Sequence, residues 1–263
     1  MVNITDPSII NKAVEGLTAQ PTIEVNTQPP PDTSVFLCGG IIDKNGYLVK
    51  DAEVRELTGA DEEAIFKAGS ISSALNTALM RGVSLIGGEQ PTKDMFDSML
   101  TGDRDQLLLA IRCATFGSTY DIFLVCQSCG KQGKSELNLE TDVETKELDD
   151  PVNGRFITVN AKVGEVVMSL PNGITQKKLM DNADKNNAEL VTIVLAGCID
   201  SVNGAPSRGP STALSLGISD RDLLIEELSK AAPGPRLGGV TKACEACGTD
   251  IPVPLSLASL FRL

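Results

Sequence analysis

Two periodicities of hydrophobic and polar positions alternate along residues 35–142. Apolar residues at every second position, bounded by Gly, Pro or Asn, are typical of strands, whereas a spacing of three to four is typical of helices. Asn45-Gly46 is a hairpin-turn signal. In chain order, the pattern predicts strands at 35–38, 47–49 and 54–57, a helix that begins at 61–63, helices at 73–83 and from 103 onward, and strands at 122–125 and 135–139.

Residues 143–263 carry a similar succession of patterns. They predict a strand at 166–170, a turn at 171–173, helices at 175–184 and 188–195, a loop at 206–210, a helix from 219 onward, an extended segment at 240–243 and an edge strand at 251–257. Asp103 and Asp220 stand where helix N-caps are expected, and Gln106 has the capping-box spacing from Asp103.

Two nearly identical cysteine turns follow predicted extended segments, one in each half of the chain. They are Cys126-Gln-Ser-Cys129-Gly130 and Cys244-Glu-Ala-Cys247-Gly248. A C-x-x-C-G turn, or knuckle, presents two thiolates from one tight loop, and its glycine lets the backbone fold beneath the sulfurs. Four thiolates complete a tetrahedral zinc site without an open position for substrate. We therefore expect Cys126, Cys129, Cys244 and Cys247 to bind one structural zinc ion.

Three other interpretations of the knuckles stay open at this point. Iron in a rubredoxin-type site has the same ligand spacing. A redox dithiol usually opens a helix after a strand, whereas these turns close on glycine and return as strands. Disulfides suit an oxidising compartment, and the chain carries no secretory signal pattern, so a reducing cytoplasm is expected. The lone Cys38, Cys113 and Cys198 lie in apolar contexts and are expected to be buried small hydrophobes.

The two halves also match each other segment by segment. Residues 54–59 correspond to 167–173, 78–82 to 194–197, 102–108 to 219–224, and Cys126 to Cys244, with a spacing that widens only slightly along the chain. We expect an α+β fold: a tandem pseudo-twofold repeat of short strands and helices, closed by a zinc ribbon with four cysteine ligands. The first repeat is placed at 35–142 and the second at 143–263, each ending in a knuckle.

Residues 1–34 are expected to form an N-terminal arm and linker. Ile9, Ile10, Val14 and Leu17 have helical spacing, and Pro29-Pro30-Pro31 is a stiff spacer. A disordered tail and a partner-binding arm are both consistent with this pattern.

Composition narrows the possible functions. A net charge of −12 repels phosphate backbones, and an aromatic content of 3% offers few stacking platforms, so nucleic acid is not an expected partner. No apolar run reaches the length of a membrane span. The chain has no histidine, which excludes Ser-His-Asp and Cys-His catalysis. The Asp-Arg-Asp triplets at 103–105 and 220–222 suit capping with a local ion pair better than acid/base chemistry. We expect no enzymatic activity and no small-molecule substrate.

Several of these segments together resemble a known family. Residues 54–63, residues 100–105, and residues 112–117 continuing through Tyr120 to the first knuckle are similar to phage baseplate hub and tail-assembly proteins of the T-even type. The likeness extends over roughly residues 50–263. It implies a virion component of a contractile tail, assembled in the host cytoplasm, whose partners are other baseplate, hub and tail-tube proteins. The alternative is a cytosolic zinc-ribbon adaptor that binds proteins outside any virion.

Overall fold

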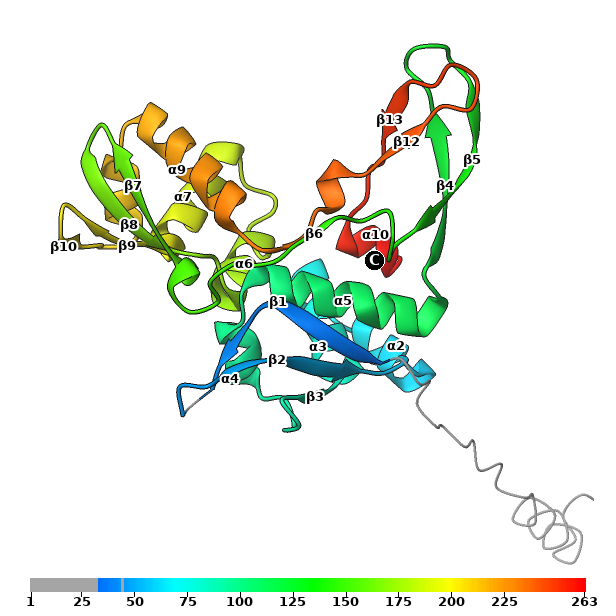
Figure 1. Ribbon diagram of the computed structural model, residues 1–263, viewed down its shortest axis with the longest axis horizontal. Helices are drawn as coiled ribbons and strands as arrows, with labels where there is room; N and C mark the ends of the chain where they lie inside the picture. Colours follow the sequence, from blue (N-terminus) through cyan, green and yellow to red (C-terminus); the bar gives the residue numbers. More distant parts are fainter. Residues whose placement is uncertain (1–32, 44) are drawn as a thin grey trace, which may run out of the picture. The chain divides into compact units, whose positions relative to one another are not determined.

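A computed structural model describes residues 33–43 and 45–263 (Figure 1). The predicted N-terminal arm lies almost entirely outside the described residues. Within the described part, no helix is long and apolar enough to cross a lipid bilayer. Helices and several small sheets are mixed along the chain, so the predicted α+β class is confirmed.

The described residues of the first half, from 33 onward, form a three-stranded sheet, four helices and a hairpin. Strands β1, β2 and β3 pair antiparallel in that order, and β4 pairs with β5. The elements are β1 (Ser34–Ile42), β2 (Leu48–Val54), α2 (Gly59–Phe66), α3 (Ile71–Gly82), β3 (Val83–Ile86), α4 (Lys93–Ser98), α5 (Thr101–Phe116), β4 (Thr119–Val125) and β5 (Gln132–Asn138).

The second half contains a four-stranded sheet of order β10-β9-β8-β7, five α-helices, two short 3-10 helices and a short hairpin. The elements are β6 (Thr145–Lys146), η1 (Asn153–Arg155), β7 (Phe156–Ala161), β8 (Gly164–Ser169), α6 (Gly173–Met180), α7 (Asn187–Cys198), β9 (Ile199–Val202), β10 (Ala205–Pro206), α8 (Pro210–Ser215), α9 (Ile218–Ala231), β11 (Gly234–Pro235), η2 (Leu237–Gly239), β12 (Thr241–Ala243), β13 (Asp250–Pro252) and α10 (Leu257–Leu260). Strand β11 pairs with β6, and β12 pairs with β13.

Two hydrophobic cores stabilise the fold. In the first, Leu79, Leu107 and Ile111 from α3 and α5 pack against the β1–β3 sheet. In the second, Met168, Leu195 and Leu224 join β8, α7 and α9. The C-terminal segment returns to the first core, where Val253, Leu260 and Phe261 are buried. The Arg112 Nε also donates to the Leu260 carbonyl at 3.1 Å. The segment after the second knuckle is therefore anchored on the first half.

Several predicted details are wrong. Helix α5 begins at Thr101 after Leu100, and α9 begins at Ile218 after Gly217, so neither Asp103 nor Asp220 is an N-cap. Each aspartate is instead the third residue of its helix and is buried. Gln106 makes no capping box; its Nε2 donates to the Phe36 carbonyl at 2.9 Å.

The boundaries of several elements also differ from those predicted. The predicted edge strand at 251–257 ends at Pro252, and α10 follows it. The predicted loop at 206–210 ends where α8 starts with Pro210 at its first position. The predicted helix at 175–184 runs from Gly173 to Met180. Proline at 252 and 254 explains the short strand, because proline cannot donate to a ladder.

Asp103 and Asp220 make equivalent hydrogen bonds, each within its own half of the chain. The Asp103 Oδ1 accepts from the Gly39 amide at 2.8 Å, within β1. Asp220 accepts from the Lys162 and Val163 amides at 3.0 and 3.1 Å, in the turn between β7 and β8. Each carboxylate thus ties the start of a long helix to the first hairpin of its half. Burial raises the pKa of Asp103 to about 6, against the lowering effect of the Gly39 amide.

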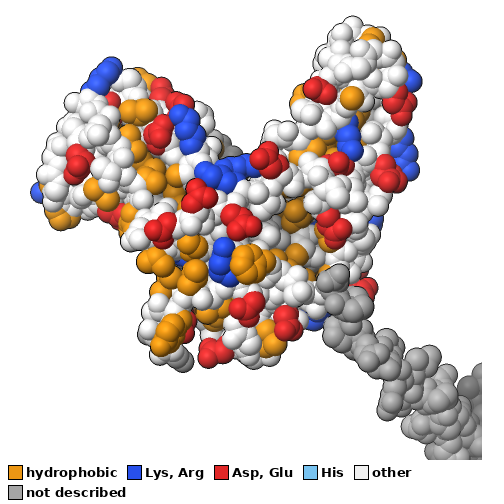
Figure 2. All heavy atoms as spheres, in the orientation of Figure 1, with side chains coloured by type: hydrophobic (Ala, Val, Ile, Leu, Met, Phe, Trp, Pro, Cys, Tyr) orange, Lys and Arg blue, Asp and Glu red, His pale blue; other side chains and the backbone are white. Residues whose placement is uncertain are grey.

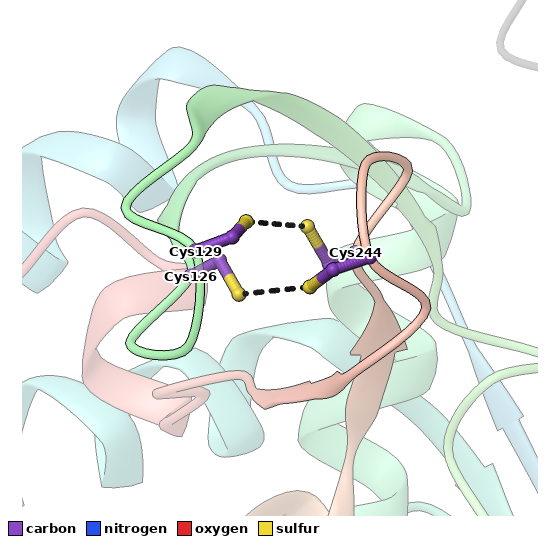
Figure 3. Close-up of side chains that lie close together, drawn as sticks. Cys126, Cys129 and Cys244 are labelled. Carbon is purple, nitrogen blue, oxygen red and sulfur yellow. Dashed lines mark hydrogen bonds between the residues drawn. The ribbon is translucent and has the colours of Figure 1, made fainter.

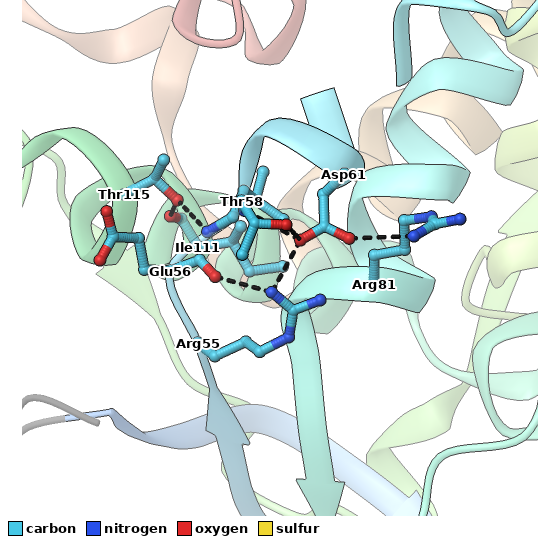
Figure 4. Close-up of polar contacts among 8 residues, drawn as sticks. Arg55, Glu56, Thr58, Asp61, Arg81, Ile111 and Thr115 are labelled. Carbon is cyan, nitrogen blue, oxygen red and sulfur yellow. Dashed lines mark hydrogen bonds and ion pairs between the residues drawn. The ribbon is translucent and has the colours of Figure 1, made fainter. Parts of the chain in front are cut away.

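A buried carboxylate organises the start of α2. Asp61 accepts from the Thr58 amide and hydroxyl, both at 2.9 Å, which completes a capping box (Figure 4). The same carboxylate pairs with Arg55 at 2.7 Å and Arg81 at 3.0 Å. Although burial opposes the change, these bonds hold the pKa of Asp61 well below its usual range. The carboxylate therefore fixes β2, α2 and α3 together.

Buried Arg104 joins the two halves. Its guanidinium donates to the Phe96 carbonyl of α4, to the Asn76 side chain of α3, and to the Gln176 Oε1 of α6 at 2.6 Å. Gln176 in turn donates to Asp105 at 2.6 Å. Leu100 and Asn172, which precede α5 and α6, form an isolated antiparallel bridge. Helix α6 is thereby seated in the groove between α3, α4 and α5.

Candidate metal centre

Both knuckles have the same backbone conformation. Cys126 directly follows β4, its amide donates to the Lys131 carbonyl, and the Gly130 amide donates back to the Cys126 carbonyl, each at 2.9 Å. Gly130 has φ 72°, a left-handed conformation that glycine adopts without a steric penalty. The turn thus reverses the chain into β5 and directs the sulfurs of Cys126 and Cys129 to one side.

The second knuckle repeats this geometry. Cys244 follows β12, its amide donates to the Thr249 carbonyl at 2.9 Å, and the Gly248 amide donates to the Cys244 carbonyl at 2.8 Å. Gly248 also has φ 72°. Lys131 of the first knuckle and Glu245 of the second form an ion pair at 3.5 Å. The glycine φ angles are equal and the hydrogen bonds are equivalent, so the two turns present their pairs of sulfur ligands in the same way.

The structure brings all four predicted sulfur atoms together. They lie within 4.8 Å of one another, with Cys126 Sγ to Cys247 Sγ and Cys129 Sγ to Cys244 Sγ both at 3.6 Å (Figure 3). Ligands at 2.3 Å from a tetrahedral zinc ion are separated by about 3.8 Å. A disulfide needs about 2.05 Å, and all seven cysteines are free. The donor set and its spacing therefore fit a closed tetrahedral metal site.

Local donors favour ionised sulfur in the second knuckle. The Thr249 hydroxyl and amide lower the pKa of Cys247 to about 6, and the Ala246 and Cys247 amides lower the pKa of Cys244. The Lys131 amide also lowers the pKa of Cys129, but the neighbouring Cys247 and Cys244 sulfurs raise it to about 12. Metal binding needs thiolate ligands, so binding of a divalent cation at this cluster would release protons.

The other three cysteines lie apart from this cluster. Cys38 and Cys198 are buried, and Cys113 is half-buried. Burial raises the pKa of Cys38 and Cys198 to about 12 and that of Cys113 to about 11. These thiols stay protonated at neutral pH, as expected for small apolar side chains in a core.

One ion pair that supports the cluster, between Lys242 and Asp142, is not predicted from the sequence. Lys242 of β12 donates to Asp142 at 2.6 Å, and Asp142 also accepts from the Asn138 amide at the end of β5. This pair joins the second hairpin to the first near the base of β4 and β5, and Figure 1 shows the two hairpins side by side. No local signal marks the pair, because its members meet only after the chain has folded.

The geometry defines an α+β protein in which two knuckles from distant parts of the chain form one four-sulfur centre. The chain belongs to the family of T4 bacteriophage base plate proteins, whose family model matches residues 50–208. No curated protein and no solved structure matches the chain. Family membership implies a phage baseplate structural protein, in the virion tail and in contact with other tail proteins. The matched region contains the first knuckle and ends before the second.

Proposed function

We propose that this protein is a non-enzymatic structural or assembly component of a contractile-tailed phage baseplate or hub, in which one zinc ion holds two repeats together. The observation that carries the baseplate role is the family match over residues 50–208. The four-sulfur cluster supports the zinc, because its donors and spacing suit a closed tetrahedral site.

The order and length of the elements support the tandem repeat. Helices α2 and α6 each have 8 residues, α3 and α7 each have 12, and α4 and α8 each have 6. Strands β3 and β9, each of 4 residues, begin directly where α3 and α7 end. Each half then continues with a long helix and a knuckle hairpin. We place the repeats at 35–142 and 143–263, although the C-terminal segment packs in the first core.

The position of the cluster suggests what zinc would do. Cys126 and Cys129 would hold it from the β4–β5 hairpin, and Cys244 and Cys247 from the β12–β13 hairpin. A metal with four protein ligands has no free position for substrate, so it supplies stability and not chemistry. The two hairpins would form a zinc ribbon that fixes the second repeat against the first and presents their surfaces to other subunits.

The proposed partners are other baseplate, hub and tail-tube proteins, encountered during assembly in the host cytoplasm. Nucleic acid, membrane and small-molecule substrates are not among them. Mass spectrometry of purified virions tests the role: the chain is expected at a fixed copy number, and electron microscopy should locate it in the baseplate. A chain that is present in infected cells but missing from virions and from tail-assembly intermediates would instead support a cytosolic zinc-ribbon adaptor.

A further inference from the structure

The second half has an open groove between α7, α8 and α9, which we call the α7–α9 groove. It is a hollow of about 600 Å³ lined by residues that include Thr192, Leu214, Ile218, Arg221 and Asp222. Leu214 and Ile218 are 67% and 79% exposed. Helix α7 is strongly apolar, yet only Leu195 and Cys198 on it are fully buried. Figure 2 shows hydrophobic side chains at the surface in the region of α7 and α9. Exposed apolar side chains around an open groove are typical of a surface that packs against another helix or strand.

The corresponding groove of the first half is filled. There α6 lies between α3, α4 and α5, and Gln176 joins Arg104 to Asp105. Gly173, the first residue of α6, has its Cα so close to the Phe96 carbonyl that a Cβ would collide with it. Met180, at the end of α6, packs against the first core. One face of α6, made of Gly173, Gln176 and Met180, therefore makes the contact.

Arg221 repeats the bonds of Arg104 almost completely. Each is the fourth residue of its long helix. The Arg104 NH1 donates to the Phe96 carbonyl at 2.8 Å, and the Arg221 NH1 donates to the Ala213 carbonyl at 3.2 Å. Phe96 and Ala213 are each the fourth residue of their short helix.

The second guanidinium nitrogen follows the same rule. The Arg104 NH2 donates to Asn76, the sixth residue of α3, and the Arg221 NH2 donates to Thr192, the sixth residue of α7. The third bond differs. Within residues 33–43 and 45–263, the Arg221 Nε donates to no side chain, and Asp222, the counterpart of Asp105, accepts from none. The α7–α9 groove thus lacks a counterpart of Gln176.

Helix α2 has a face equivalent to the one by which α6 contacts the first half. By position in the helix, Gly59, Glu62 and Phe66 correspond to Gly173, Gln176 and Met180. All three are exposed, Phe66 by 59%. A Cβ on Gly59 would meet nothing within 4 Å, so this chain gives no packing reason for glycine there. A close approach to a second molecule does give one, as it does at Gly173.

We propose that α2 of one copy of this chain docks in the α7–α9 groove of a second copy, and so repeats between molecules the contact that α6 makes within one. The interface is heterologous, because it joins two different surfaces, and it generates a ring or an open filament. Ile218 begins α9 as Thr101 begins α5, and the Thr101 amide donates at 3.0 Å to the carbonyl of Pro171, two residues before α6. The equivalent contact between molecules would place exposed Ile218 beside Leu57, two residues before α2 of the next copy. Leu57 lines an apolar hollow of about 130 Å³ next to α2. The proposal rests on the tandem repeat in the proposed function.

Glu62 makes this contact weaker than the one inside the chain. A carboxylate accepts from the Arg221 Nε, but it cannot donate to Asp222 as the Gln176 amide donates to Asp105. Two carboxylates facing each other repel at neutral pH. Glu62→Gln restores one donor and removes the repulsion, so it is expected to tighten the association by about fivefold or more.

The test measures the mass of the zinc-loaded full chain by sedimentation as a function of protein concentration. Wild type is expected to associate. Gly59→Leu on the helix and Ile218→Asp in the groove should each weaken association by at least about tenfold. Both sites are exposed, so the fold should survive, and circular dichroism checks this. Gly133→Leu, at another glycine with open space around it, is the matched control and should associate normally.

Mixing the two variants gives the sharpest result. Gly59→Leu keeps an intact groove and Ile218→Asp keeps an intact α2, so an equimolar mixture should form heterodimers and nothing larger. A monomeric wild type, association that both variants leave unchanged, or a mixture that stays monomeric would each overturn the proposal. None of these results bears on the zinc centre or on a place in the baseplate, because neither residue contacts the knuckles.

Discussion

Replacing the buried carboxylate of Asp61 by an amide should destabilise the first half of the protein. Asp61→Asn keeps the size of the side chain and one oxygen that accepts from the Thr58 amide. It removes the negative charge that pairs with Arg55 and Arg81. The oxygen that is kept toward Thr58 also faces Arg55, so the new amide NH2 turns a donor toward the Arg81 guanidinium. The change therefore isolates the charge from the capping geometry.

The expected magnitude follows from exposure. A hydrogen bond to a charged group contributes about 1.5 to 3 kcal/mol when buried. The side chains of Arg55 and Arg81 are 38% and 46% exposed, so water compensates part of each loss. With roughly 1 kcal/mol lost at each arginine and a smaller loss at the Thr58 hydroxyl, the total is about 2 to 3 kcal/mol.

Urea denaturation followed by circular dichroism measures this difference. Because the native pKa of Asp61 is lowered, its contribution is complete above the unfolded value of about 4 and declines as the pH falls further. Wild type and Asp61→Asn should thus differ fully at pH 7 and converge in acid. Asp121→Asn, which breaks the exposed Lys134 pair, is the control and should cost under about 0.5 kcal/mol. Equal stabilities of the two variants at pH 7 would refute the reasoning.

Two further predictions concern other buried positions. Burial raises the pKa of Asp103 to about 6, so the native state favours the protonated carboxyl, and wild-type stability should fall as the pH rises from about 4 to above 6. Asp103→Asn should lack this loss of about 2 to 3 kcal/mol, and parallel pH profiles of the two proteins would contradict it. Gly173→Ala should cost about 1 to 3 kcal/mol because its Cβ meets the Phe96 carbonyl, whereas Gly59→Ala, in open space, should leave the stability of the monomer unchanged or slightly raised. Urea titration of both alanine variants decides this, and an equal cost at the two glycines would be the contrary result.

The sequence predicted features that depend on short stretches of chain. The knuckles were recognisable because ligand spacing, turn and glycine lie within five consecutive residues. The hairpin after Ile42 follows from the same kind of local signal, Asn45-Gly46. The sulfur cluster joins distant parts of the chain, but each knuckle supplies half of a four-ligand set, so the pairing could be inferred from the two local motifs. Helices α3 and α7 are long enough for their apolar spacing to stand out, and both were predicted.

Features that depend on distant parts of the chain were not predictable in this way. Asp103 has the composition of a cap, but its partner Gly39 comes from the first strand, so local rules assigned the wrong position. Arg104 looked like part of an ion pair with its neighbours, whereas the fold buries it among α3, α4 and α6. Helices α4 and α8, with 6 residues each, are too short to display a period. Thr92 at the N-cap of α4 and Pro210 at the start of α8 are the local signals that mark these two helices.

Metal analysis of the purified protein tests the central claim, that one zinc ion joins the two halves through Cys126, Cys129, Cys244 and Cys247. Elemental mass spectrometry is expected to find about one zinc per chain in wild type and in the control Cys113→Ser. Cys129→Ser and Cys244→Ser, which take one ligand from each half, should lose most of the zinc and melt at a clearly lower temperature, because metal-binding energy is also folding energy. Iron in place of zinc would change the identity of the metal but would leave the link between the two halves in place. Full metal content and unchanged melting in both ligand variants would contradict the account.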